Sequence, residues 1–206
     1  MTINIYPATL LEASTGRVVD AEIWDAITDQ HIADWNCQWK PAMQAAVNAR
    51  RALGVGQALL PQSSHWLWDE KARATKGLLA YPSFAVVSEG GTQGLMITEL
   101  LGSCRCPTQF GKPLVYVHFI EVAPWNQVGL MVGAPRLSGV GSVLLSTAIQ
   151  LSRYEGFEGR IGLHSLPQSN SWYGNKCGMI DFGPDVSKQG MHYFEMTPEQ
   201  AKAFTV

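Results

Sequence analysis

The segment Pro135–Ser142 has the residue spacing most suggestive of chemistry in the chain. Gly139 and Gly141 flank one residue where a long stretch of helical apolar spacing begins. Glycine permits positive φ and lets a ligand approach the backbone closely. Amide N–H groups at the positive end of a helix dipole suit a phosphate or pyrophosphate. The pattern therefore predicts an anion site, with a glycine-rich helix start that binds nothing as the structural alternative.

Two nucleotide-binding motifs fit this segment poorly. A P-loop places a lysine directly after its second glycine, and no lysine lies near this segment. A dinucleotide fingerprint places a third glycine where this sequence has Leu144, and it follows a strand without a long loop.

His118 and Glu121 are the acid–base candidates of an apolar stretch, Leu114–Val122, that predicts a central strand. Strand alternation places two residues three apart on opposite faces, so only one can face a cleft unless a bulge intervenes. Burial raises the pKa of a carboxyl group, which suits a general base and favours Glu121 over His118. A hydrogen-bonded core or edge residue is the alternative for both.

Other chemistry-bearing residues support weaker hypotheses. The aromatic-rich segment His65–Asp69 is a candidate wall for an acceptor pocket, or it packs at a helix start that Asp69 caps. His164 precedes a serine, but no Gly-x-Ser-x-Gly elbow accompanies it, so a hydrolase triad is not expected. The histidines and cysteines lack metal-ligand spacing, and structural or surface thiols are favoured over a metal or redox role. The four cysteines are Cys37, Cys104, Cys106 and Cys177.

The elements that must position these residues follow from periodicity and turn residues. In the N-terminal part we expect a first strand within Arg17–Ile27, a helical stretch from Thr28 to about Leu53 that is broken or restarted at Pro41 and ended by Gly54–Gly56 and Pro61, and a helix Asp69–Ala80. The middle part predicts the strands Ser83–Ser88 and Gly94–Leu101 around the turn Glu89–Thr92, a loop Gly102–Pro113, the strand Leu114–Val122 and a loop Ala123–Pro135. The C-terminal part predicts a helix Ser138–Tyr154, a strand Arg160–Ser165, a short helix Gln168–Cys177, a strand Met191–Met196 and a helical tail from Pro198. This order predicts a mixed α/β sheet with helices on its faces.

Composition limits the classes of function. The chain has 206 residues and a formal net charge of −2, so the basic excess of a nucleic-acid binder is absent. No apolar run has the roughly 20 residues that span a bilayer, and the first residues lack a signal-peptide pattern. Four scattered cysteines do not make a disulfide framework. We therefore expect a cytoplasmic protein with neither nucleic acid nor membrane as partner.

Several ordered features together resemble the GNAT (general N-acetyltransferase) superfamily. They are Val122-Ala-Pro124, Arg136-x-x-Gly139-x-Gly141, the helix that follows, the strand Arg160–Ser165, Asn170-Ser-Trp-Tyr173 and Cys177-Gly178-Met179. The resemblance covers about residues 83–197. It implies one GNAT-like domain over 1–206, in which 1–82 is an N-terminal strand and helical elaboration, 83–197 is the cofactor-binding core and 198–206 is a tail.

The resemblance also implies roles for individual residues. The strand ending at Val122 diverges from the next strand, and Val122 pairs with the pantetheine arm of acetyl-CoA or another short acyl-CoA. Asn170 matches an asparagine that contacts the cofactor, and Tyr173 matches a tyrosine that protonates the leaving thiolate. The pyrophosphate is held by Arg136, Ser138, Gly139, Val140, Gly141 and Ser142.

Two features depart from the family pattern. Eleven residues, Trp125–Pro135, separate Pro124 from Arg136, where the family usually has about three, so we expect an insertion that overhangs the cofactor cleft. Tyr173 lies one residue farther from the following glycine than in the commonest spacing. A packed aromatic beside Trp172 is the structural alternative for Tyr173.

The function expected from the resemblance is acyl-CoA-dependent N-acyltransfer, most simply of acetyl to a primary amine by direct attack. The acceptor is a small-molecule amine or a peptide, and no metal is expected. The resemblance also allows a homodimer. Two other functions stay open: a non-catalytic acyl-CoA-binding or sensor module, and an acetyltransferase acting on a protein or a tRNA-linked amine. The acidic charge balance disfavours tRNA.

Overall fold

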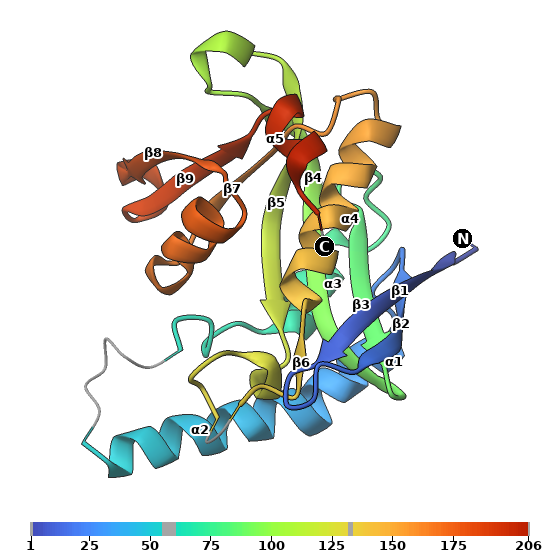
Figure 1. The fold of residues 1–206 in the computed structure, drawn as a ribbon, viewed down its shortest axis with the longest axis vertical. Helices are drawn as coiled ribbons and strands as arrows, with labels where there is room; N and C mark the ends of the chain where they lie inside the picture. The colour runs from blue at the N-terminus through green and yellow to red at the C-terminus, as the bar shows by residue number, and fades with distance from the viewer. Residues whose placement is uncertain (1, 55–60, 132–133, 206) are drawn as a thin grey trace. The chain divides into compact units, whose positions relative to one another are not determined.

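A computed structural model describes residues 2–54, 61–131 and 134–205 (Figure 1). These residues form nine strands and five α-helices. The strands are β1 (Ile5–Glu12), β2 (Val18–Trp24), β3 (Ser83–Ser88), β4 (Gly91–Ser103), β5 (Pro113–Val122), β6 (Leu137–Ser138), β7 (Ile161–Ser165), β8 (Ile180–Asp185) and β9 (Met191–Met196). The helices are α1 (Asp29–Asp34), α2 (Lys40–Ala52), α3 (Trp68–Thr75), α4 (Val140–Tyr154) and α5 (Pro198–Ala203).

The strands make one mixed sheet in the order β6-β1-β2-β3-β4-β5-β7-β9-β8. The β5–β7 pairing is parallel, and helix α4 lies between these two strands in the chain. The predicted strand–helix–strand unit is therefore confirmed, as is the central position of β5. The fold class, a mixed α/β sheet flanked by helices, is confirmed as well.

The chain divides into two compact units. The first unit comprises Met1–Gly77, Ser83–Leu95 and Ile120–Gly141, and the second comprises Leu78–Pro82, Met96–Phe119 and Ser142–Val206. The prediction of a single domain over 1–206 with an N-terminal elaboration stays a prediction.

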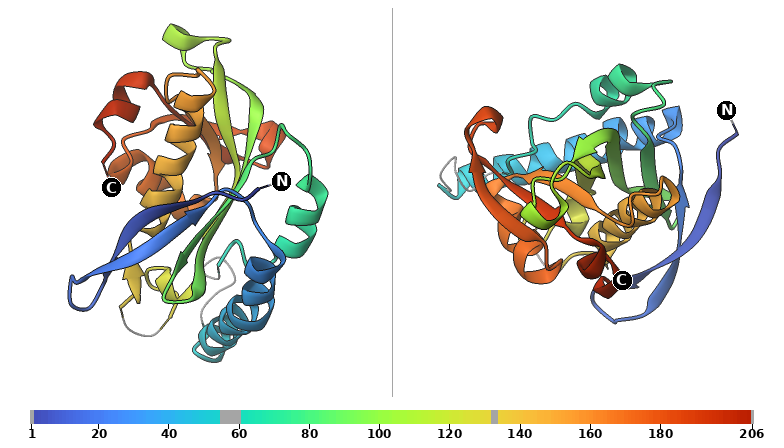
Figure 2. Two further views of the ribbon diagram at one scale, coloured as in Figure 1. Left: turned by 90° about the vertical axis from the view of Figure 1, so that its right-hand side faces the viewer. Right: turned by 90° about the horizontal axis from the view of Figure 1, so that it is seen from above.

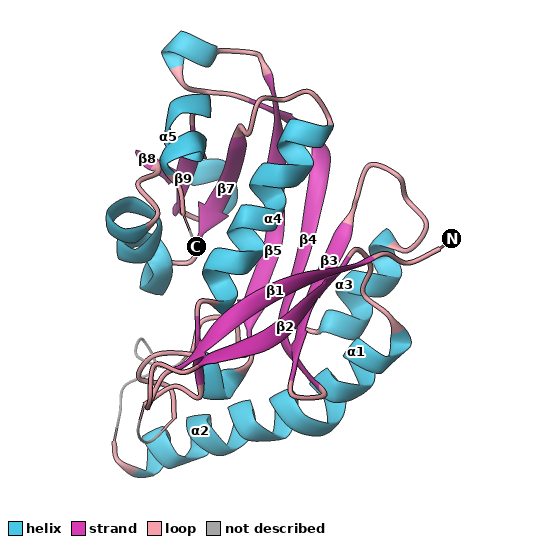
Figure 3. Ribbon diagram, turned by 45° about the vertical axis from the view of Figure 1, so that its right-hand side comes forward, coloured by secondary structure: helices cyan, strands magenta, loops and turns pink. Residues whose placement is uncertain are grey.

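In the first unit, β1 and β2 form a long antiparallel ribbon that continues into β3 (Figure 3). The expectation that the first strand lies within Arg17–Ile27 is wrong, because that segment holds β2 and β1 precedes it. Pro7 interrupts the strand signal of β1. A proline is tolerated there because β6 pairs with β1 only at Leu11 and Glu12, which leaves Pro7 on an edge.

The helical stretch from Thr28 is continuous past Pro41 (Figure 1). Thr28 is the N-cap at its start and forms a capping box with His31. A π-helical turn, Trp35–Trp39, carries the helix into α2, where Pro41 occupies the first turn and needs no hydrogen-bond acceptor. Residues 55–56 of the predicted helix end lie outside the described residues.

The β3–β4 turn is a two-residue hairpin loop as predicted. Glu89 has φ 52° and Gly90 has φ 73°, the two positive values that a type I′ turn requires. Helix α3 ends at Thr75, five residues before the predicted end at Ala80, because Lys76 is extended (ψ 122°) and Gly77 has positive φ. Strand β4 begins and ends beyond its predicted bounds, running from Gly91 to Ser103.

In the second unit, α4 presents an apolar face of which Leu144, Leu145 and Ala148 are fully buried. Helix α5 lies beside the C-terminal end of α4, where the Arg153 guanidinium donates to the Ala201 carbonyl at 3.0 Å (Figure 2). Strand β9 has its predicted bounds. Strand β8 was not predicted, because its pairing with β9 is irregular between Asp181 and Pro184 and alternation breaks there.

No helix in the described ranges is both long and apolar enough to cross a membrane.

Candidate active site

The glycine segment has the local geometry that an anion site requires. Ser138 ends β6, Gly139 adopts φ +94°, and α4 begins at Val140, two residues after the predicted start. A side chain is strained at that φ, so glycine is needed for the sharp entry into the helix. The first-turn amides of an α-helix have no intrahelical acceptor, and Ser138 and Gly139 are exposed. The residue types and backbone here fit a pyrophosphate.

Arg136 flanks this segment. Its guanidinium lies over the Trp125 ring at 5.8 Å, and its main-chain N–H donates to the Trp125 carbonyl at 3.0 Å. The insertion that contains Trp125 is anchored within the first unit: Asn126 and Trp125 both donate to the Gln93 side chain, and Leu130 packs with Met43, Ala46 and Val47 of α2. Residues 132–133 of the insertion lie outside the described residues.

Strand β5 continues past the end of its parallel ladder. The β5–β7 register covers Val115–Val117 and Ile161–Leu163, while β5 runs on to Val122. The backbone of β5 beyond Val117 is thus outside the ladder registered with β7. At Val122 the carbonyl accepts a hydrogen bond from the Gln127 side chain at 2.9 Å.

Glu121 is a buried carboxyl of the first unit. Its side chain is 8 % exposed, and it accepts hydrogen bonds from the Trp68 indole N–H at 2.5 Å and from the Ser63 side chain. Burial raises the pKa of Glu121 to about 7, although the Ser63 and Trp68 hydrogen bonds and the positive charge of Lys71 each act to lower it. A carboxyl with this pKa exchanges protons at neutral pH.

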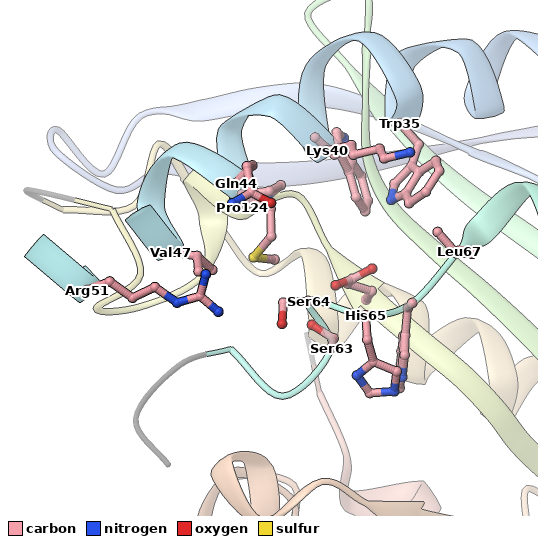
Figure 4. A pocket seen from close by; sticks show the side chains of 14 residues that line it. Trp35, Lys40, Gln44, Val47, Arg51, Ser63, Ser64, His65, Leu67 and Pro124 are labelled. Carbon is pink, nitrogen blue, oxygen red and sulfur yellow. The ribbon is translucent and has the colours of Figure 1, made fainter. Parts of the chain in front are cut away.

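A cavity of about 240 Å³ opens beside Glu121 (Figure 4). One wall is the α1–α2 helical run and the other is the segment Ser63–Leu67, as the labelled side chains show. The lining residues are Trp35, Trp39, Lys40, Met43, Gln44, Val47, Arg51, Ser63, Ser64, His65, Trp66, Leu67, Glu121 and Pro124. The predicted aromatic segment therefore contributes His65, Trp66 and Leu67 to a pocket wall. Asp69 does not cap α3, whose N-cap is Leu67.

The sequence analysis did not identify the α2 side of this cavity. The sequence does contain an indication of this wall, because its lining side chains recur every fourth residue and so share one helix face. They are Trp35, Trp39, Met43, Val47 and Arg51. Such spacing predicts a buried face equally well, and only the opposing segment Ser63–Leu67 reveals that part of the face borders a cavity.

In the second unit, His118 is exposed, and its Nδ1 lies 3.4 Å from Glu99 Oε2. Rings of Tyr81 and Tyr116 meet it edge-on. The contrast with buried Glu121 agrees with the alternation predicted for β5. The role of His118 as a base stays a prediction.

Asn170 and Tyr173 lie on a helical segment of the second unit that ends in a π-helical turn, Trp172–Lys176. Asn170 Oδ1 is buried and has no hydrogen-bond partner among the described residues. Tyr173 is buried against Trp172 and Phe194, and burial raises the pKa of its phenol well above the usual value. The contact with Trp172 matches the packing alternative for Tyr173, and it leaves an acid role open.

The second unit contains a polar cluster around His164 that the sequence did not predict. His164 bonds Tyr116 Oη through Nδ1 at 2.7 Å and Asp185 Oδ2 through Nε2 at 3.0 Å. Arg105 donates to the same Asp185 oxygen at 2.7 Å. Ser165 Oγ instead donates to the Leu166 carbonyl, so this histidine–aspartate pair serves no serine nucleophile.

The cysteines divide by burial. Cys104, Cys106 and Cys177 are buried and Cys37 is exposed, all as free thiols. No group of three or more metal-ligating side chains gathers in the described part of the chain.

Comparison of the structure with solved structures decides the fold. The GNAT domain of PAT from S. lividans matches with a TM-score of 0.54 at 15% identity, over 92% of this chain and 96% of that one. The chain has the GNAT fold. No family model and no curated protein sequence matches the chain.

Two further solved structures are similar to this chain. A protein of Bacillus halodurans matches with a TM-score of 0.56 at 9% identity, covering 96% and 93% of the two chains. The PaiA N-acetyltransferase of Thermoplasma acidophilum, solved with coenzyme A, matches with a TM-score of 0.48 at 10% identity, covering 96% and 99%. The likeness to the S. lividans GNAT domain, at 15% identity, shows the fold alone.

Proposed function

We propose that the chain is an acyl-CoA-dependent N-acyltransferase that transfers acetyl, or another short acyl group, to a primary amine by direct attack. Glu121 carries this proposal: a buried carboxyl with a pKa of about 7 borders a cavity that can hold a small acceptor. The GNAT fold supports the choice of acyl-CoA as donor.

The residues fit an acyl-CoA at three points. The amides of Gly139, Val140, Gly141 and Ser142, with the Ser138 hydroxyl and Arg136 beside them, have the character of a pyrophosphate site. Val122 lies beyond the registered β5–β7 ladder, and we expect its main chain to pair with an amide-bearing arm of the cofactor. Buried Asn170 Oδ1 lacks a donor, which an amide N–H of the bound arm would supply. When bound, acyl-CoA supplies the activated thioester carbonyl.

Burial of Glu121 and Tyr173 underlies the acid–base roles that we propose for them. Glu121 Oε1 or Oε2 takes the proton that the amine loses as its N–C bond forms and the thioester C–S bond breaks. Tyr173 keeps its proton at neutral pH because burial raises its pKa, so it can donate to the departing thiolate. His118, exposed beside Glu99, is the alternative base.

Acetyl-CoA binding tests the cofactor site. Gly139→Val forces a β-branched residue to φ +94° and disturbs the helix entry, so we expect calorimetry to show acetyl-CoA affinity lowered by about tenfold or more. Gly16→Val is the matched control, because Gly16 has φ +72° in the turn between β1 and β2 with no neighbouring heavy atom within 4 Å. Absence of acetyl-CoA binding to the wild type at millimolar concentration overturns the proposal.

Tyr173→Phe tests the proposed acid while keeping the ring that packs against Phe194. We expect kcat for acetyl transfer to fall by about 10²-fold, the lower range for a positioned acid, with acetyl-CoA affinity unchanged. An unchanged kcat would assign Tyr173 to packing alone.

A further inference from the structure

The ionisable side chains around the cavity are unevenly charged. Lys40 and Arg51 bring two permanent positive charges, and Glu121 brings one carboxyl whose pKa is about 7. Glu121 is buried, whereas Lys40 and Arg51 are exposed on α2, so the carboxyl lies deep and the cations lie at the rim. In Figure 4 the Arg51 guanidinium extends from α2 toward Ser63 and Ser64. These hydroxyls and the guanidinium are all hydrogen-bond donors.

The cavity is small and its deep walls are aromatic. Trp35 and Trp39 are 5% and 1% exposed, and Met43 and Val47 are buried beside them. A volume of about 240 Å³ corresponds to roughly eight waters at about 30 Å³ each, below the range of about 300–1,000 Å³ for drug-sized ligands. This volume can hold a molecule about the size of a single amino acid.

The aromatic faces already hold the chain's own ammonium groups. Lys40 Nζ lies 5.6 Å over the Trp35 ring, and Lys71 Nζ lies 5.1 Å over the Trp66 ring. Lys71 also interacts electrostatically with Glu121. A substrate with several positive charges would meet two lining cations, Lys40 and Arg51, and one carboxyl, a net repulsion.

We propose that the acceptor is a small primary amine that also carries an anionic group, a carboxylate or a phosphate. This inference rests on the proposed acyltransferase function. The amine lies by Glu121, which takes its proton, and the apolar part packs on Trp35, Trp39 and Met43. The anionic group lies by Arg51, with the Ser64 hydroxyl as a further donor, because the Ser63 hydroxyl already donates to Glu121.

Matched acceptors test the charge requirement. Thiol release from acetyl-CoA is measured with leucine, leucinamide and isoamylamine, with O-phosphoethanolamine and ethanolamine, and with spermidine. We expect kcat/KM for the anionic member to exceed that of its neutral partner by about tenfold or more, the scale of a charge-assisted hydrogen bond. Preference in the leucine set assigns a carboxylate, and preference in the ethanolamine pair assigns a phosphate. Equal rates within both sets, or a preference for spermidine, overturn the inference.

Arg51→Gln tests the proposed anion contact. We expect the ratio of kcat/KM between the anionic and neutral acceptors to fall by about tenfold, through KM rather than kcat. Arg73→Gln removes the same charge from an exposed residue of α3 that does not line the cavity. An equal fall in both variants would mean that only overall charge matters, which overturns the contact.

A binding measurement separates this inference from the proposed function. Tryptophan fluorescence of the full chain is titrated with the same acceptors, because three tryptophans line the cavity. Saturable quenching by an anionic amine, weakened by Arg51→Gln and unaffected by Arg73→Gln, supports an anionic-amine site in this cavity, and if acetyl-CoA then fails to bind, only the proposed acyltransferase function is overturned. Binding of acetyl-CoA with no response to any anionic amine overturns the inference and leaves the proposed function standing.

Discussion

Each unit of the molecule contains a carboxyl group held by side-chain hydrogen bonds, but the two carboxyls have opposite pKa shifts. In the first unit, burial outweighs the hydrogen bonds from Trp68 and Ser63, and the pKa of Glu121 rises to about 7. In the second unit, hydrogen bonds from Ser187, Arg105 and His164 outweigh burial, and the pKa of Asp185 falls far below its usual value. A permanently ionised carboxylate cannot exchange protons at neutral pH.

The difference lies in what compensates the charge. Arg105 gives Asp185 a direct ion pair at 2.7 Å, whereas at Glu121 the hydrogen bonds and the charge of Lys71 do not offset the cost of burial. A buried carboxylate whose charge is incompletely stabilised has a raised pKa and can accept a proton near neutral pH. A carboxylate that is strongly hydrogen-bonded stays ionised and serves a structural role. Asn170 differs from both carboxyls, because its buried Oδ1 has no donor among the residues that the structure describes.

The largest expected effect is on catalysis at Glu121. Glu121→Gln keeps the acceptor oxygen for Trp68 but cannot take a proton, so we expect kcat/KM for acetyl transfer to fall by about 10³-fold. In the wild type, kcat/KM should rise with pH through about 7 as Glu121 ionises, and the variant should lose this rise. Steady-state thiol release measures both.

The matched control is Glu70→Gln, on an exposed residue of α3. A fall of less than tenfold in Glu121→Gln, or an unaltered pH profile, would move the base elsewhere, with His118→Gln as the next variant to measure.

The second expected effect is on stability. The pKa of Glu121 is higher in the folded protein than the ordinary 4.5, so the folded state binds more protons between about pH 4.5 and 7. Stability from this group is present below about pH 4.5 and is lost as pH rises through about 7. At about 1.36 kcal/mol per pKa unit, the loss is on the order of 3 kcal/mol. Urea unfolding at pH 5 and pH 8 measures the free energy of unfolding of Glu121→Gln and of the wild type. We expect the variant to become more stable relative to the wild type at pH 8 than at pH 5. A difference in unfolding free energy that is the same at both pH values would contradict a raised pKa of Glu121.

The third effect tests Asn170. Asn170→Ala removes a buried acceptor that has no partner, so the melting temperature of the protein alone should not fall, while acetyl-CoA affinity falls by about fivefold to tenfold. Asn175→Ala, on an exposed residue of the same helical segment, serves as the control. Thermal unfolding and calorimetry give the two numbers, and a loss of stability with unchanged affinity would make Asn170 structural.

The smallest expected effect on activity is at Asp185. Asp185→Asn weakens the bonds to Arg105 and His164, so the melting temperature should fall at neutral pH, while kcat/KM stays within about twofold of the wild type. The stability that Asp185 provides is present above its ordinary pKa near 3.8 and is lost as pH falls below it, so the variant and the wild type should converge in acid. A large loss of kcat/KM would make this cluster part of the catalytic machinery.

Local signals predicted much of the framework. Strands β3 and β9, the Glu89–Gly90 turn and the capped start of α1 were predictable because apolar runs, turn residues and caps act over a few residues. Edge strands β1 and β8 were missed because Pro7 and the irregular pairing at Asp181–Pro184 break alternation, and edges tolerate both.

The candidate site divides in the same way. By itself, the sequence determined the GNAT-like order of elements, the glycine entry into α4 and Glu121 as a buried-carboxyl candidate. These depend on residue type and neighbouring positions. Only the tertiary structure decided that Trp68 and Ser63 bond Glu121, that Lys40 and Arg51 border the same cavity, and that Tyr116, His164 and Asp185 form one chain of hydrogen bonds. These contacts join residues far apart in the chain, and a pKa depends on the balance of burial and partners that such contacts set.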